Sequence, residues 1–315
     1  MNKIEFGDCR ETMRKWASEG VKAQTCVTSP PYFGLRDYGH DGQIGLEETP
    51  EEYMATMVEV FRCVRDVLAD DGTVWLNIGD SYFSTTKGSG GTGKSTLGPN
   101  RDLQNIQFQK MNQIRIDAGN TGCKPKDLIG IPWMLAFALR ADGWYLRQDI
   151  IWHKPNPMPE SVQDRCTKSH EYIFLLSKSP KYYYDIDAIK EEAANAGNLS
   201  DSFKLRQGNA NYQVQSDGEG SDKKIYDLKN KRSVWTVTTK HYDGAHFAVF
   251  PADLIEPCIL AGAPVGGIVL DPFMGSGTTA QVAQNLGRQY LGCELNKDYE
   301  SLQNKRLAQQ SLVLE

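Results

Sequence analysis

The stretch of sequence that decides the fold runs from residue 267 to residue 280 and reads GIVLDPFMGSGTTA. Its apolar start, through Leu270, predicts a short buried strand, and Gly275–Ala280 fits the G-x-G-x-x-[GA] pattern that joins such a strand to a helix. Glu294 ends the next predicted strand, 23 residues after Asp271, close to the spacing of about 20 at which a carboxylate accepts from ribose hydroxyls. The pattern predicts an adenosine-containing cofactor and leaves NAD and S-adenosylmethionine (AdoMet) both open.

Strands and helices alternate along the rest of the chain. The clearest helix begins after Thr49, with Pro50 at its first position and Glu52 completing a capping box, and it ends near Asp71-Gly72. The alternation predicts an α/β fold, a doubly wound and mostly parallel sheet with helices on both faces. Strands are expected at 3–6, 26–27, 73–78, 147–152, 171–176, 267–270 and 289–293, and further helices at 132–140 and 278–286.

Two segments, residues 84–127 and 188–242, interrupt this alternation without any sustained apolar period. We interpret both as insertions into one catalytic domain made of residues 1–187 and 243–315. Hydrophobic residues at 40% and charged residues at 24% exclude collagen-like, coiled-coil and wholly disordered classes for these 315 residues. No apolar stretch approaches the roughly 18 residues of a membrane span, so a cytoplasmic protein without a membrane partner is expected.

The net charge of -5 argues against a nucleic-acid partner, because phosphate contacts need Lys and Arg. The acidity is uneven, however: residues 1–87 carry 9 Lys/Arg against 15 Asp/Glu, and the remainder sums to about +1. A local cationic surplus lies at residues 223–240, where one acid, Asp227, accompanies Lys223, Lys224, Lys229, Lys231, Arg232 and Lys240.

Two further motifs are excluded by their surroundings. Gly88–Ser95 matches the phosphate-loop pattern, but no strand leads directly into it and Gly98-Pro99 would break the helix that must follow. Pro257-Cys258 resembles the nucleophile of cytosine-C5 methyltransferases, yet it lies in an apolar, helix-like stretch and is interpreted as a packing residue. The cysteines and histidines show no metal-ligand spacing, so no metal is expected.

Ser29-Pro30-Pro31-Tyr32 follows the second predicted strand and is unusual on physical grounds. Two successive prolines donate no backbone hydrogen bond and fix their own φ, so the loop presents carbonyl acceptors in a rigid arrangement. The Ser29 hydroxyl and Pro30 carbonyl suit the hydrogens of an exocyclic base amine, and Tyr32 suits stacking on that base after it is flipped from a duplex. The alternative is a simple Pro-Pro turn with a packing tyrosine.

Together, the loop Thr28–Tyr32 and the segment Asp271–Thr279 resemble the exocyclic-amino DNA methyltransferases, the adenine-N6 and cytosine-N4 enzymes. The order of the two motifs resembles the circularly permuted β group of that family. The resemblance implies a Rossmann-like class I AdoMet fold with inserted target-recognition regions. Further matches occur at Gly7-Asp8-Cys9, 72–80, 152–155, 246–251 and 290–294.

The resemblance also implies roles for particular residues. AdoMet would be bound by Asp8, Phe250, Pro251, Asp271, Phe273, Gly275, Gly277 and Glu294, and the target base would be held by Ser29, Pro30, Pro31 and Tyr32. Within the family, serine at the first position of the catalytic motif favours cytosine N4, and adenine N6 is the alternative.

The resemblance makes double-stranded DNA the expected partner. Residues 188–242 are interpreted as the target-recognition region and residues 84–127 as a second DNA-facing loop; a solvated surface is the alternative for each. The candidate DNA contacts are Arg36, Lys223, Lys224, Lys229, Lys231 and Arg232. A cognate restriction endonuclease and a homodimer are left open. A nicotinamide-dependent oxidoreductase is the alternative from another class, although the Ser29–Tyr32 loop has no obvious role in hydride transfer. A catalytically silent DNA-binding module would be expected to lack Ser29, Tyr32 or Asp271, and all three are present.

Overall fold

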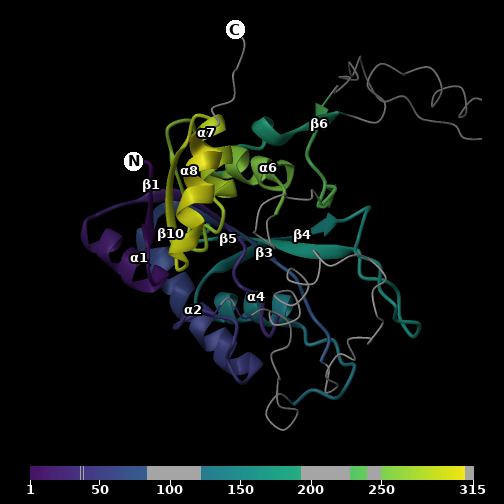
Figure 1. The fold of residues 1–315 in the computed structure, drawn as a ribbon. Helices are drawn as coiled ribbons and strands as arrows, with labels where there is room; N and C mark the ends of the chain where they lie inside the picture. The colour runs from purple at the N-terminus through teal and green to yellow at the C-terminus, as the bar shows by residue number, and fades with distance from the viewer. Residues whose placement is uncertain (36, 38, 84–121, 193–227, 240–249, 309–315) are drawn as a thin grey trace, which may run out of the picture.

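The computed structural model describes residues 1–35, 37, 39–83, 122–192, 228–239 and 250–308 (Figure 1). The main strands are β1 (Lys3–Phe6), β2 (Ala23–Thr28), β3 (Leu68–Ile78), β4 (Tyr145–His153), β5 (His170–Ser177), β8 (Val234–Thr236), β9 (Ile268–Asp271) and β10 (Gln289–Glu294). The helices are α1 (Cys9–Ser18), α2 (Pro50–Val67), α4 (Ile131–Ala141), α6 (Ala252–Gly262), α7 (Thr278–Asn285) and α8 (Glu300–Ala308).

Eight strands form one sheet in the order β1-β10-β9-β2-β3-β5-β4-β8. Every neighbouring pair is parallel except the two made by β5, which runs antiparallel between β3 and β4. From β9 the chain continues to β10 on one side, whereas β2 leads to β3 on the other, so β9 and β2 flank the topological switch point. The predicted α/β class and mostly parallel sheet are confirmed.

Helices cover both faces of this sheet, with α1, α2 and α4 on one side and α6, α7 and α8 on the other (Figure 1). Side chains of β3 alternate between the two cores: Val74 and Leu76 pack with α1, α2 and α4, whereas Trp75 packs with α6 and α7. This alternation follows from the strand period of two, and it explains why the central strands are apolar on both faces.

The predicted helix after Thr49 is present as α2, with both hydrogen bonds of the capping box in place. Its end differs from the prediction, because α2 stops at Val67 and β3 begins at Leu68, five residues before the strand expected at Thr73. Leu68 is buried and pairs with Ala23 of β2, so sheet pairing outweighs the helical pattern there.

Part of the segment 188–242 is built into the sheet. Strand β8 pairs in parallel with β4, and Trp235 on β8 is buried in the core beside Trp75. A separate small ladder joins β6 (Glu191–Glu192) to β7 (Leu228–Lys229). Within the described ranges, no helix has an apolar span that would reach across a bilayer.

Candidate active site

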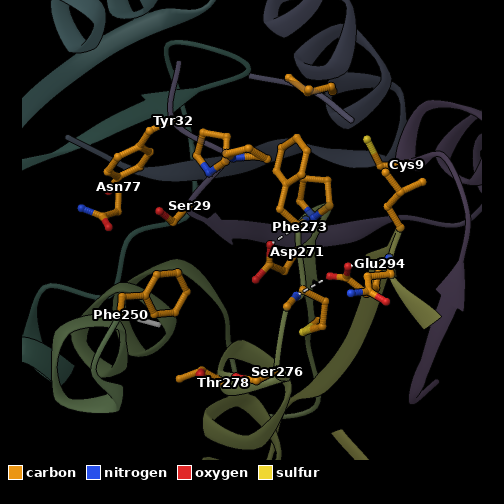
Figure 2. A pocket seen from close by; sticks show the side chains of 18 of the residues that line it. Cys9, Ser29, Tyr32, Asn77, Phe250, Asp271, Phe273, Ser276, Thr278 and Glu294 are labelled. Atoms are coloured by element: carbon orange, nitrogen blue, oxygen red, sulfur yellow. Dashed lines mark hydrogen bonds between the residues drawn. The ribbon is translucent and has the colours of Figure 1, made fainter. Parts of the chain in front are cut away.

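A cavity of about 450 Å³ opens at the carboxyl ends of β2 and β9. Figure 2 shows its two ends: Ser29, Tyr32 and Asn77 lie together at one, and Cys9 and Glu294 lie at the other. The predicted base loop and the predicted cofactor loop therefore line one cavity, of the size typical of small-molecule sites.

Asp271, at the end of β9, ties the two loops together. Its Oδ1 accepts from the Thr28 hydroxyl at 2.6 Å and from the Phe273 N–H at 3.0 Å, and its Oδ2 accepts from the Thr279 hydroxyl at 2.6 Å. The carboxylate thus connects the end of β2, the glycine loop and the start of α7. Burial raises the pKa of Asp271 from 3.8 to about 6, although these hydrogen bonds oppose the rise.

The raised pKa of Asp271 predicts a pH effect on stability. The folded carboxyl holds its proton to about pH 6 and the unfolded one releases it near 3.8, so stability is lost as pH rises through that window. We expect the stability of Asp271→Asn relative to wild type to rise by about 1 kcal/mol between pH 5 and pH 7.5. Urea titrations of both proteins at the two pH values measure this, and a difference that stays constant would contradict it.

Glu294, at the end of β10, holds the glycine loop. Its Oε2 accepts from the Gly275 N–H at 2.7 Å and its Oε1 from the Asn296 N–H at 2.8 Å. Burial raises the pKa of this carboxyl, and the two backbone donors counter that rise. Gly275 has φ 53° and Gly277 has φ 87°, both in the left-handed region that favours glycine.

Ser276, in the same loop, lines the cavity with a hydroxyl that is buried and has no hydrogen-bond partner among the described residues. A buried polar atom without a partner is costly, so this hydroxyl marks a place for a polar ligand atom. The apolar rings of Phe250 and Phe273 line the same cavity (Figure 2). Apolar walls, acidic groups and an unpaired hydroxyl together fit a nucleoside-type cofactor.

Asp8 lies at the N-terminus of α1 and lines the cavity. Its carboxylate accepts from the Arg10 guanidinium at 2.6 Å and from the Arg10 N–H at 2.7 Å. These hydrogen bonds lower the pKa of Asp8, so it is an acceptor at neutral pH. Two other residues expected at the cofactor, Gly277 and Pro251, are not among the residues that line the cavity; they are the N-cap residues of α7 and α6.

The two proline carbonyls of the Ser29–Tyr32 loop differ in their hydrogen bonding. The Tyr53 hydroxyl donates to the Pro31 carbonyl at 2.8 Å, which fixes the loop against α2. Among the hydrogen bonds of the described residues none reaches the Pro30 carbonyl, so this acceptor is available at the cavity.

Among the polar residues that line the cavity and were not predicted as site residues, three form one cluster: Asn77, Lys154 and Glu171. Glu171 on β5 accepts from the Tyr32 hydroxyl at 2.7 Å and from the Asn77 amide at 3.3 Å, and it forms an ion pair with Lys154. Two of the three have a weak signal in the sequence, since Asn77 interrupts an apolar strand and Glu171 begins one. Cys258, by contrast, is buried on α6 away from the cavity, in keeping with a packing role.

The described cations of the candidate DNA-binding set lie outside the cavity lining. Lys229 and Arg232 both pair with Glu191, at 3.6 and 2.6 Å, and Lys231 lies over the Trp235 ring. Glu191, which lies outside residues 223–240, therefore neutralises part of the cationic surplus of that segment. Arg36, Lys223, Lys224 and Lys240 lie outside the described residues.

The comparison with protein families matches a DNA methylase model of the N6/N4 type to residues 23–305. The chain belongs to the N6/N4 DNA methylase family. The match spans the Ser29–Tyr32 loop, the glycine loop and the strands from β2 to β10, so the predicted resemblance is confirmed.

Two relatives align with this DNA methylase over nearly its whole length. The Type II methyltransferase M.SmaI of Serratia marcescens is 49% identical over 97% of this chain and 90% of its own length. The Type II methyltransferase M.Cfr9I of Citrobacter freundii is 46% identical over 96% of this chain and 86% of its own.

Solved structures of low sequence identity share the fold of this methylase. The PvuII DNA methyltransferase, described as cytosine-N4-specific, superposes with a TM-score of 0.60 at 16% identity, covering 99% of this chain and 88% of its own. A DNA modification methylase from Thermus thermophilus in complex with S-adenosyl-L-methionine has a TM-score of 0.58 at 21% identity, with coverages of 100% and 96%.

Proposed function

We propose that this DNA methyltransferase transfers a methyl group from AdoMet to the exocyclic N4 of a cytosine flipped out of duplex DNA. The observation that carries the proposal is the cavity that the Ser29–Tyr32 loop and the glycine loop line together, tied by the Thr28–Asp271 hydrogen bond. One cavity then receives the methyl donor and the acceptor amine. The bond from nitrogen to the methyl carbon forms as the methyl–sulfur bond breaks, the sulfur keeps that electron pair and leaves as a thioether, and the nitrogen releases one of its two protons to solvent.

The methyl donor is AdoMet, which when bound supplies an electrophilic methyl group on a sulfonium. Glu294 and Asp8 offer carboxylates to hydroxyl and amine donors, and Phe273 and Phe250 offer apolar walls. The unpaired Ser276 hydroxyl adds a polar contact at the glycine loop. These features favour AdoMet over a nicotinamide cofactor in a chain that belongs to a DNA methylase family.

The residues of the base loop act on the amine through hydrogen bonding and stacking. Its lone pair is delocalised into the ring, which makes the nitrogen a poor nucleophile. The Ser29 hydroxyl and the Pro30 carbonyl accept its two hydrogens, which draws the nitrogen toward tetrahedral geometry and its lone pair toward the methyl group. Tyr32 stacks on the base and offsets part of the few kcal/mol that flipping costs.

Cytosine is favoured because serine occupies the first position of the loop and because a solved structure sharing the fold is described as cytosine-N4-specific. Adenine N6 is the second candidate, since its amine offers the same two hydrogens to the same acceptors. Incubation with AdoMet and mixed-sequence DNA, followed by mass spectrometry of the nucleosides, separates the two. N6-methyladenine alone would overturn the cytosine assignment, and no modified base would overturn both.

A cognate restriction endonuclease is a candidate partner of this protein, because the relatives M.SmaI and M.Cfr9I are both named Type II methyltransferases. Methylation of a short duplex sequence would then protect that sequence from cleavage. Purified DNA treated with the enzyme and AdoMet, then challenged with endonucleases of different specificity, identifies the protected site. A homodimer stays a prediction that sedimentation of the purified chain tests.

Target recognition is proposed to lie in residues 188–242. Of its described cations, Lys229 and Arg232 form partly exposed ion pairs with Glu191, which are worth only about 0–1 kcal/mol, so phosphate can compete for them. Replacing either with Ala should weaken binding to all DNA sequences alike and reduce the slope of log affinity against log salt by about 1. Lys22→Ala, on the opposite half of the chain, serves as the control, and an unchanged salt slope in the Lys229 and Arg232 variants would exclude them as phosphate contacts.

Gly79 is predicted to be essential to the placement of Tyr32. A Cβ at this position would lie 2.8 Å from Tyr32 Cε2 and 3.2 Å from Glu171 Cδ, too close for either side chain to stay in place. Gly79→Ala should therefore displace the tyrosine ring and lower kcat by about 10-fold or more, because small misplacements are costly to an oriented reaction. Single-turnover methyl transfer measures this, with AdoMet affinity expected to stay unchanged; a wild-type rate would contradict it.

A further inference from the structure

Glu171 is the centre of a polar cluster at the base end of the cavity. Its two carboxylate oxygens have different partners: Oε1 pairs with the Lys154 ammonium, and Oε2 accepts from the Tyr32 hydroxyl at 2.7 Å and the Asn77 amide at 3.3 Å. The four side chains come from β3, β5, the loop after β2 and the segment after β4. Residues far apart in the sequence are thus joined through one carboxylate.

The cluster is largely shielded from solvent, so its geometry is well constrained. The side chains of Lys154 and Glu171 are 19% and 16% exposed, and the Lys154 ammonium also lies 4.3 Å from the centre of the Trp152 ring. Asn77 makes a second hydrogen bond, to the Tyr172 carbonyl at 3.1 Å, which fixes the amide from the other side. A carboxylate held by a half-buried cation and an anchored amide has little freedom to turn.

We propose that Glu171 is a positioning residue that sets the orientation of the Tyr32 ring before the target base arrives, and that Lys154 and Asn77 hold Glu171 for this task. The inference rests on the proposed function, in which Tyr32 stacks on the base. The Tyr32 hydroxyl donates its proton to a hydrogen bond with Glu171. It therefore anchors the ring and does not act as an acid or a base. Burial and the neighbouring carboxylate raise the pKa of this phenol well above its usual value, which keeps it a donor.

The close packing behind the ring supports this role. A Cβ on Gly79 would lie 2.8 Å from Tyr32 Cε2 and 3.2 Å from Glu171 Cδ, so the absence of a side chain there leaves room for the two to meet. The edge of the Tyr32 ring thus lies against Gly79, just after β3, and its hydroxyl is held by Glu171 on β5. A preorganised stacking surface costs less to use than one that must be ordered as the base binds.

The test is a mutant cycle on Tyr32 and Glu171, measured as the single-turnover rate of methyl transfer with AdoMet and DNA saturating. Glu171→Ala should slow transfer about 100-fold, as expected for a misplaced group in an oriented reaction. Tyr32→Phe keeps the ring and loses the anchor, and should slow it about 10-fold, equivalent to one hydrogen bond to a charged group. The double variant should be as slow as Glu171→Ala alone, because the tyrosine anchor has no partner once the carboxylate is gone.

Two further variants separate positioning from a general structural role. Glu171→Gln keeps an oxygen acceptor for the Tyr32 hydroxyl and should stay within about 10-fold of wild type. Glu160→Ala removes an ion-paired glutamate outside the cavity lining and should leave the rate unchanged. AdoMet affinity should be the same in every variant. Multiplicative losses in the double variant, a Gln variant as slow as the Ala variant, or a loss of AdoMet binding in Glu171→Ala would each overturn the inference.

A readout without turnover distinguishes failure of this inference from failure of the proposed function. In protein labelled with ¹³C at the tyrosine ring, the Tyr32 signal is identified by its loss in Tyr32→Phe. It should shift or broaden in Glu171→Ala and stay near its wild-type position in Glu171→Gln. An unchanged signal in Glu171→Ala would exclude positioning even in a protein that methylates normally, whereas a wild-type enzyme that modifies no base would overturn the proposed function alone.

Discussion

Tyr32→Ala should lower the rate of methyl transfer by up to about 100-fold while AdoMet binds with nearly wild-type affinity. Stacking of a flipped base on an aromatic ring contributes about 1–3 kcal/mol, and the alanine variant loses that contribution entirely. The ring also lines the base end of the cavity, away from Glu294 and Cys9 at the cofactor end (Figure 2). Rapid-quench transfer assays and calorimetric AdoMet titrations measure the two quantities separately.

Tyr145→Ala is a matched control for this variant, because Tyr145 is an exposed tyrosine at the start of β4 and lies outside the cavity lining. It should transfer methyl groups at the wild-type rate. If Tyr32→Ala lost AdoMet binding together with turnover, the tyrosine would be a structural residue of the whole site, and the assignment of the Ser29–Tyr32 loop to the target base would be wrong.

Asp271→Ala should have the second large effect, on both stability and AdoMet binding. The buried carboxylate accepts from the Thr28 hydroxyl, the Phe273 N–H and the Thr279 hydroxyl, and alanine would leave all three without an acceptor. Each unsatisfied buried donor costs about 1–3 kcal/mol, so the free energy of unfolding should fall by about 3 kcal/mol or more. AdoMet affinity should fall too, because the glycine loop loses its link to the end of β2.

Asp142→Ala provides the comparison, since the Asp142 carboxylate pairs with the exposed guanidinium of Arg62. Its loss should change the free energy of unfolding by no more than about 1 kcal/mol and leave AdoMet binding intact. Denaturant unfolding and AdoMet titration of both variants decide the matter. If Asp271→Ala were no less stable than Asp142→Ala, the carboxylate would not be the link between the two loops.

Local chemistry made several elements predictable from the sequence. The start of α2 is defined by three residues within four consecutive positions, Thr49, Pro50 and Glu52. No contact with a distant part of the sequence is needed to define where this helix begins. The glycine loop is likewise local, since left-handed φ values at Gly275 and Gly277 favour glycine wherever the rest of the chain lies. Helix α1 was not predicted, although Asp8 caps it and Cys9, Met13 and Trp16 follow with helical spacing.

Other features depend on strands that meet only in the folded protein. The antiparallel direction of β5 depends on its pairing with β3 and β4, and an apolar run has no preference for either direction. Glu191 pairs with Lys229 and Arg232, which lie on the other side of a long intervening segment. The net charge of residues 223–240 alone therefore overestimated how many of their cations are free of acidic partners.

The alternation of strands and helices along the sequence predicted the fold class, and the resemblance carried by residues 267–280 and by the Ser29–Tyr32 loop predicted the family and its cofactor. Both motifs can be recognised in the sequence because glycine and proline act on the backbone locally. The tertiary structure alone decided what surrounds Tyr32. Glu171 reaches it across 139 positions of sequence because β3 and β5 pair in the sheet. Hydrogen bonds of this kind leave no periodic trace in the chain, since their partners are selected by strand order and register rather than by neighbouring residues.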